Sequence, residues 1–197
     1  RMDQPLGREV GNANEMRESI EVLNGGGPED IVELTLAFGE VMLDLAGVDG
    51  GRDRLTETIA TGAALEKLIE VVVAQGGDPS VIRDPSLLAI CPHEEVIEAD
   101  RDGYVTQCDA LIIGTVATRL GAGRERKEDV VDPGVGITVD AKLGEKVTKG
   151  QTLARVRFSD PARWEAQRDA LAKAWAIGDN ALDVGPLIVE RVEAPAS

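Results

Sequence analysis

The sequence is poor in aromatic residues, which make up only 3% of its 197 residues. Because 43% of the residues are apolar, its hydrophobic core has to be built mainly from aliphatic side chains. No apolar run reaches the roughly 20 residues that a membrane-spanning helix needs, and no stretch resembles a signal peptide. We therefore expect one or two modest domains in a cytoplasmic protein without a membrane partner.

Histidine and cysteine are almost absent. His93 is the single histidine, which argues against a histidine-based triad or metal cluster. Cys91 and Cys108 show no repeated spacing, so they predict neither a disulfide framework nor a zinc site. Two cysteines of this kind are typical of a reduced cytoplasm.

Positive charge is also in deficit, with 21 Lys and Arg against 36 Asp and Glu and a net charge of −15. Nucleic acid and anionic membrane surfaces would be repelled by such a chain, so we exclude both as partners. A phosphate-bearing substrate is not excluded, because a local basic pocket can exist on an acidic protein.

The opening segment, residues 1–18, carries the most information. Pro5 and Gly7 indicate irregular backbone. Asn12 is a good N-cap for a following helix, and Glu15 stands at the spacing of a capping box. We therefore predict a loop that leads directly into a helix.

Within that helix, Met16, Ile20 and Leu23 recur on one face and predict a buried stripe. Glu18 lies off the stripe, where its carboxylate can face back toward the preceding loop. A loop that aims main-chain carbonyls at one carboxylate forms an all-oxygen cage, which hard cations prefer. The alternative is that Glu18 is a solvated surface residue and Glu15 only a cap.

Three short motifs in this segment carry a family resemblance. They are Asp3-Gln4-Pro5-Leu6-Gly7, Val10-Gly11-Asn12-Ala13 and Glu15-x-x-Glu18. In this order and at these separations they resemble the thymidine and pyrimidine-nucleoside phosphorylases. The resemblance implies a potassium ion held by the carbonyl oxygens of Leu6 and Glu9 and the carboxylate of Glu18, with the other half of the site upstream. Position 9 is usually small or apolar in the family, but a main-chain ligand tolerates that change.

The next stretch predicts helices. Their expected ranges are Pro28–Ala46, Arg52–Thr61 and Ala63–Gln75. The first has a strong apolar period through Ile31, Leu34, Phe38, Val41, Met42 and Leu45. The segment Asp84–Pro92, framed by two prolines, is the best domain boundary.

Beyond the boundary the pattern changes to short strands. Glu95–Ala99 and Tyr104–Gln107 flank Asp102-Gly103, which predicts a hairpin. The pattern next predicts a helix over Asp109–Leu120 and a strand at Gly136–Val139. It then predicts a helix from Pro161 to about Ile177, with Trp164, Leu171 and Trp175 buried, and a final strand at Val184–Val192.

The spacing Leu143-Gly-x-x-Val147-x-x-Gly150-x-x-Leu153 resembles biotinyl and lipoyl carrier hammerheads. Neither carrier lysine motif is present, so Lys142, Lys146 and Lys149 read as ordinary turn residues. The phosphorylases carry the same type of module at their carboxy-terminal end, so the two resemblances agree.

We therefore expect an α+β chain in which helices from the second half of an α/β domain precede an α/β-hammerhead (barrel-sandwich-like) domain. The expected divisions are 1–84 for the helical region, 85–92 for the linker and 93–197 for the carboxy-terminal domain. The chain starts without methionine and inside a motif, which suggests a portion of a longer enzyme.

The resemblance implies that the parent enzyme, expected as a homodimer, cleaves thymidine or uridine with phosphate to base and (deoxy)ribose 1-phosphate. The family's phosphate- and base-binding motifs lie upstream of residue 1, so we assign this chain no catalytic and no substrate-binding residue. It is expected to lack activity alone and to need no organic cofactor. The alternatives are a carrier-type binding module with a modified lysine and a non-catalytic regulatory or assembly module.

Overall fold

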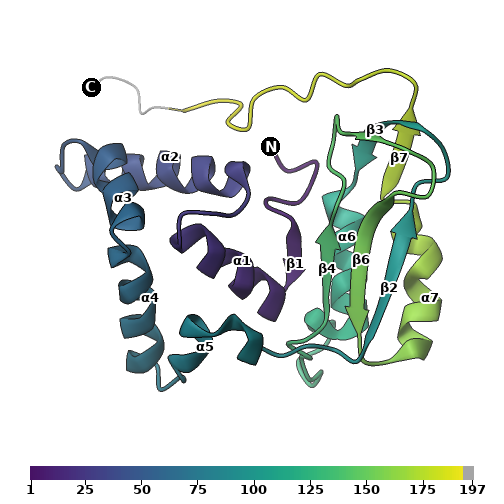
Figure 1. Cartoon of the computed structure of the whole chain (residues 1–197), viewed down its shortest axis with the longest axis horizontal. Coiled ribbons are helices and arrows are strands. Elements are labelled where there is room, and N and C mark those ends of the chain that lie inside the picture. Colours follow the sequence, from purple (N-terminus) through teal and green to yellow (C-terminus); the bar gives the residue numbers. More distant parts are fainter. Residues whose placement is uncertain (193–197) are drawn as a thin grey trace.

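The computed structural model describes residues 1–192 and places a helical arm beside a body of strands and helices (Figure 1). The α+β class is therefore confirmed. None of the helices in the described region of the chain is long and apolar enough to cross a membrane.

The helical arm holds the elements between residues 13 and 87. They are α1 Ala13–Leu23, α2 Glu29–Leu45, α3 Gly51–Ala60, α4 Ala63–Ala74, α5 Ser80–Arg83 and the 3-10 turn η1 Pro85–Leu87. A small buried cluster of Ile20, Ile69 and Ile82 packs α1, α4 and α5 together. The buried core of the arm is consequently much smaller than that of the body.

The predicted apolar stripe of α2 is largely uncovered. Phe38, Met42 and Leu45 expose 62%, 69% and 85% of their surface, and Leu36 is the buried residue of the helix. A 3.6-residue period predicts that one face is apolar, but burial requires a partner element, and α3 covers only some of this face.

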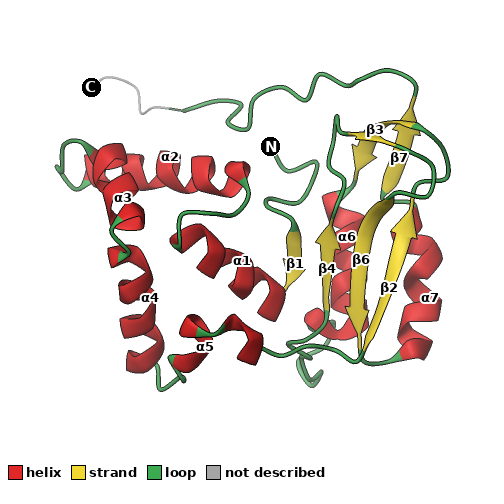
Figure 2. Cartoon of the chain, in the orientation of Figure 1, coloured by secondary structure: helices red, strands yellow, loops and turns green. Residues whose placement is uncertain are grey.

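The body contains two antiparallel sheets and two main helices (Figure 2). The larger sheet has the order β1 Glu9–Gly11, β4 Gly136–Val139, β6 Thr152–Phe158 and β2 His93–Glu98. The smaller sheet has the order β5 Lys146–Val147, β3 Gly103–Cys108 and β7 Trp175–Gly178. The helices are α6 Ala110–Ala117, continued by the π turn η2 Thr118–Ala122, and α7 Pro161–Ala172.

The main core lies between the larger sheet and the helices α6 and α7. Ile137 and Val156 point from the sheet into this core, and Ile113 and Leu171 fill it from the helices; all four are fully buried. The alternate residues of β4 and β6, such as Thr138 and Arg155, therefore face the opposite side, toward α1.

Strand β1 joins the helical arm to the body. Glu9, Val10 and Gly11 pair with Thr138, Ile137 and Gly136 of β4. The amide of Ala13, at the start of α1, donates to the carbonyl of Pro133 at 3.1 Å. Residues 9–11, which the sequence assigns to the helical region, thus extend the sheet of the body. The sequence predicted a plain loop here, because a three-residue edge strand leaves no alternation to recognise.

The predicted hairpin around Asp102-Gly103 is wrong. Strand β2 pairs with β6, whereas β3 pairs with β5 and β7, so the turn carries the chain from one sheet to the other. The Asp-Gly pair correctly marks a change of direction, but local turn chemistry does not decide which strand becomes the neighbour.

Two predictions near the carboxy-terminal end are also wrong. The last helix ends at Ala172 instead of continuing to Ile177, because Trp175–Gly178 pairs with β3 as β7. Trp175 is buried as expected, and its indole N–H donates to the carbonyl of Ala141 at 3.0 Å. Val184–Val192 forms no strand and crosses back over the molecule toward the helical arm (Figure 1).

Candidate cation site

Glu18 points from α1 back at the loop that precedes the helix, as the sequence predicted. Its carboxylate accepts hydrogen bonds from the amide of Arg8 at 2.8 Å and from the amide of Glu9 at 3.4 Å. Glu18 is only 6% exposed, so the solvated-surface alternative is wrong. Glycine is required at position 7, where φ is +65° and an added Cβ would lie 2.4 Å from Glu18 Oε2.

The capping box is only half formed. Glu15 reaches back as predicted, but its carboxylate accepts the amide of Gly11 at 2.8 Å, not that of Asn12. Asn12 makes no side-chain cap and instead donates to the carbonyl of Ala122 at 2.7 Å. The contact with the η2 turn takes the Asn12 side chain away from the helix terminus, a tertiary effect that local spacing does not reveal.

The surroundings of the Glu18 carboxylate favour its neutral form. Burial raises the pKa of this carboxyl, the two amide hydrogen bonds lower it, and the charges of Glu9 and Asp30 raise it further. Within residues 1–192, Glu18 forms no ion pair with any lysine or arginine. A buried carboxylate with acidic neighbours and no counter-charge is the environment that a bound cation would stabilise.

The other two predicted ligands lie on the same loop. In the stretch of chain that the structure describes, the carbonyl oxygen of Leu6 accepts no hydrogen bond from the protein. Glu9 turns its side chain away, because its carboxylate accepts the Asn14 amide at 2.8 Å and the Thr138 hydroxyl at 2.8 and 3.0 Å. The main-chain amide of Glu9, and not its side chain, therefore faces Glu18.

The donor set contains oxygen only. Among the described residues, no three Asp, Glu, His or Cys side chains gather into a group that could hold a metal ion. The candidate site consequently depends on main-chain carbonyls plus one carboxylate, a donor set that suits a hard, weakly bound cation better than a transition metal.

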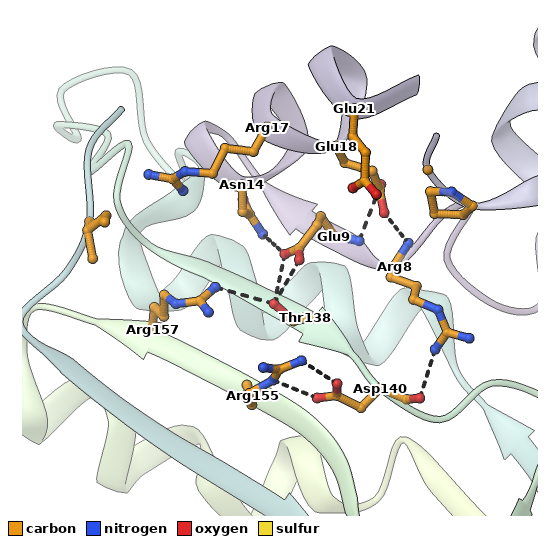
Figure 3. Close-up of a pocket in the computed structure, with 13 residues that line it drawn as sticks. Arg8, Glu9, Asn14, Arg17, Glu18, Glu21, Thr138, Asp140, Arg155 and Arg157 are labelled. Carbon is orange, nitrogen blue, oxygen red and sulfur yellow. Dashed lines mark hydrogen bonds and ion pairs between the residues drawn. The ribbon is translucent and has the colours of Figure 1, made fainter. Parts of the chain in front are cut away.

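A polar cavity of about 550 Å³ lies beside this loop, between α1 and the outer face of the larger sheet (Figure 3). Its arginines are mostly paired within the sheet. Arg155 binds Asp140 through two hydrogen bonds of 2.9 and 2.5 Å, and Arg157 binds Glu94 at 2.9 Å. Arg8 pairs with Glu145, whereas Arg17 donates to the main-chain carbonyls of Pro85, Leu88 and Ala89 and, among the described residues, forms no ion pair with a carboxylate.

Residues 104–178 match the family described as pyrimidine nucleoside phosphorylase C-terminal domain. The matched range runs from β3 to β7, so it includes all three strands of the smaller sheet. Over 191 residues, or 97% of this chain, the sequence is 43% identical to a thymidine phosphorylase of Mycobacterium tuberculosis. Over 159 residues it is 42% identical to a pyrimidine-nucleoside phosphorylase of Staphylococcus epidermidis.

The resemblance to the thymidine and pyrimidine-nucleoside phosphorylases is confirmed. The chain spans 43% of the length of the mycobacterial phosphorylase and 37% of the length of the staphylococcal one. The mycobacterial match covers nearly the whole chain, so the phosphorylase likeness is not restricted to the carboxy-terminal domain.

Sequence reasoning missed two residues, Lys142 and Asp30, that hold the loop in place. Lys142, interpreted as an ordinary turn residue, is only 8% exposed and pairs with Asp30 at the start of α2. Its ammonium also donates to the carbonyl of Gly7 at 2.7 Å. The two residues are 112 positions apart, so no local pattern connects them; the only sequence signal was a lysine between apolar neighbours Ala141 and Leu143.

Proposed function

We propose that this chain belongs to a pyrimidine-nucleoside phosphorylase that cleaves thymidine or uridine with phosphate to free base and (deoxy)ribose 1-phosphate. The observation that carries the proposal is the 43% identity over 191 residues with a protein named thymidine phosphorylase. Bond cleavage of this type passes through an oxocarbenium-like transition state. The enzyme therefore has to position phosphate beneath the sugar and stabilise the departing base, which requires placement of charge more than a nucleophilic side chain.

Within that enzyme, this chain supplies a scaffold and no catalytic group. The cavity contains no histidine among the described residues, and three of its four arginines are paired with carboxylates, which argues against a phosphate site here. The same proposal includes a helical region over residues 1–84, a linker over 85–92 and an α/β-hammerhead domain over 93–197. It also includes a homodimeric parent and a cytoplasmic location.

The expected result is that the isolated 197-residue chain releases no thymine or uracil from the nucleoside and phosphate. The physical reason is that the chain lacks the groups that would hold the phosphate beneath the sugar. Chromatographic detection of the base, at micromolar enzyme and in potassium phosphate buffer, measures this directly. The control is the full-length protein from the same source, which should release base. Turnover by the isolated chain would contradict the scaffold role, and an inactive full-length protein would contradict the phosphorylase assignment.

We also propose that the loop and α1 form half of a potassium site, with the carbonyl oxygens of Leu6 and Glu9 and the carboxylate of Glu18 as ligands. The buried, unpaired charge of Glu18 and the free carbonyl of Leu6, both within residues 1–192, support the proposal. When bound, the ion would neutralise Glu18 and brace the loop against α1. The protein's own contribution is to hold the oxygen ligands in place before the ion arrives.

Potassium should therefore stabilise the chain through Glu18. At a concentration ten times the dissociation constant, the gain is about 1.4 kcal/mol, or roughly 3–6 °C in Tm for a chain of this size. Glu18→Gln should abolish the difference between KCl and choline chloride at equal ionic strength, because a neutral amide is a weaker cation ligand. Glu57→Gln, at an exposed position of α3 that does not line this cavity, should keep it.

The stabilisation by potassium should decrease as pH falls. Because the pKa of Glu18 is raised, the folded chain binds this proton more readily than the unfolded chain does. As pH falls through the raised pKa, the potassium-free protein gains stability from this group, whereas stabilisation by potassium shrinks. A potassium effect that is retained in Glu18→Gln, or that grows as pH falls, would rule out this carboxylate as the ligand.

A further inference from the structure

We propose that Lys142 is a positioning residue for the cation loop. Together with Asp30, it fixes the two peptide groups of Gly7 and thereby sets the distance between the Leu6 carbonyl and the Glu18 carboxylate. The inference rests on the potassium site proposed above, and it assigns control of that site to the body of the molecule.

Gly7 is held at both of its backbone polar groups. Its amide donates to Asp30 Oδ2 at 3.1 Å, and its carbonyl accepts the Lys142 ammonium at 2.7 Å. The ammonium in turn donates to the same Asp30 oxygen at 2.5 Å. This closed arrangement of three groups leaves Gly7 no freedom to rotate its peptide planes without breaking a buried hydrogen bond.

The neighbouring residue is held from the same direction. The Arg8 guanidinium donates to the carbonyls of Asp140 at 2.7 Å and Val139 at 3.2 Å, and it pairs with Glu145 at 2.9 Å. The Arg8 amide is the donor that binds Glu18 Oε1. The segment 139–145, which begins at the last residue of β4, therefore binds both Gly7 and Arg8, the two residues next to the peptide that Glu18 contacts.

If only the charge of Lys142 mattered, its ammonium would weaken cation binding at the loop instead of supporting it. Its ammonium pairs with Asp30, and among the described residues no contact with Glu18 is present. Asp30 nevertheless binds the amide of Gly7, whose added Cβ would lie 2.4 Å from Glu18 Oε2, so an unpaired Asp30 lies near enough to attract a cation to this loop. Removing Lys142 would therefore strengthen cation binding if only electrostatics mattered, and it weakens cation binding if the loop geometry matters.

The test compares Lys142→Met with the wild-type chain in two measurements. The first is the KCl concentration at half-maximal stabilisation, with choline chloride holding ionic strength constant. We expect Lys142→Met to raise it at least tenfold. The second is amide hydrogen exchange of Gly7 and Arg8 without potassium, which should become at least tenfold faster while the amides of the β2–β6 ladder keep their protection.

Lys146→Met is the matched control, because it makes the same charge change at an exposed position of β5, four residues further along the chain. It should leave both measurements within about twofold of wild type. If Lys142→Met does not fold, as loss of ladder protection would show, Lys142→Gln keeps a polar side chain of similar length and should shift both measurements in the same direction.

Unchanged exchange at Gly7 and Arg8 in the Lys142 variant would overturn the proposal, and so would an equal or higher affinity for potassium. A wild-type chain that shows no stabilisation specific to potassium would defeat the cation site itself. In that case the exchange measurement alone decides whether Lys142 positions the loop, so the two failures are distinguishable.

Discussion

Ile113→Ala should lower the free energy of unfolding by about 2–5 kcal/mol. Ile113 is fully buried in α6, where it contacts the core between the larger sheet and α7. Removing three carbon atoms there loses apolar burial and leaves a cavity that the surrounding β4 and β6 side chains cannot close, because the sheet fixes their backbone. Since a domain is stable by only about 5–15 kcal/mol, this is a large fraction of the total.

The same helix provides the control. Leu111 is two residues away and 80% exposed, so Leu111→Ala should change the free energy of unfolding by no more than about 0.5 kcal/mol. Urea denaturation followed by far-UV circular dichroism measures both variants, with equal m-values as the sign that the comparison is valid. Similar losses in the two variants would mean that α6 is not packed as described.

Gly7→Ala should destabilise the chain by about 2–4 kcal/mol and remove its response to potassium. Two effects add. The φ of +65° costs a residue with a side chain about 1–2 kcal/mol, and the new Cβ would lie 2.3 Å from Ile31 Cδ1 and 2.4 Å from Glu18 Oε2. Ile31 can rotate away, but Glu18 can move only by giving up its hydrogen bonds to Arg8 and Glu9, which leaves a buried carboxylate poorly satisfied.

Gly25→Ala separates the two effects. Gly25 has a similar φ of +84°, but an added Cβ there meets no atom within 4 Å. It should cost only the conformational term of about 1–2 kcal/mol and leave the potassium response unchanged. Thermal unfolding in KCl and in choline chloride, run on both glycine variants, gives the two quantities together. A normal potassium response in Gly7→Ala would place the cation somewhere other than this loop.

Local physical chemistry allowed several features to be predicted from the sequence. The direction of Glu18 followed from its place off the apolar stripe, about one turn into a helix that begins right after the loop. The strand at Gly136–Val139 and the burial of Trp164, Leu171 and Trp175 followed from apolar patterning. The family likeness depended on short motifs whose spacing is fixed by the same loop.

Contacts between distant segments were not predictable. Three features depend on which distant segment a strand or a side chain meets. They are the pairing of β1 with β4, the separation of β2 and β3 into different sheets, and the ion pair of Lys142 with Asp30. Every strand edge offers the same backbone N–H and C=O groups, so the local sequence of a strand does not determine which strand it pairs with.

The sequence by itself determined that this protein is an acidic α+β chain of aliphatic cores, that its first loop leads into a helix bearing Glu18, and that it resembles nucleoside phosphorylases. Tertiary structure alone decided that Glu18 is buried without a counter-charge among the described residues and that Lys142 grips the loop from a distant segment of the chain. The physical reason is that the local pattern of side chains determines backbone conformation and which face tends to be buried. Which charged groups pair is determined only when distant segments of the chain pack together and exclude water.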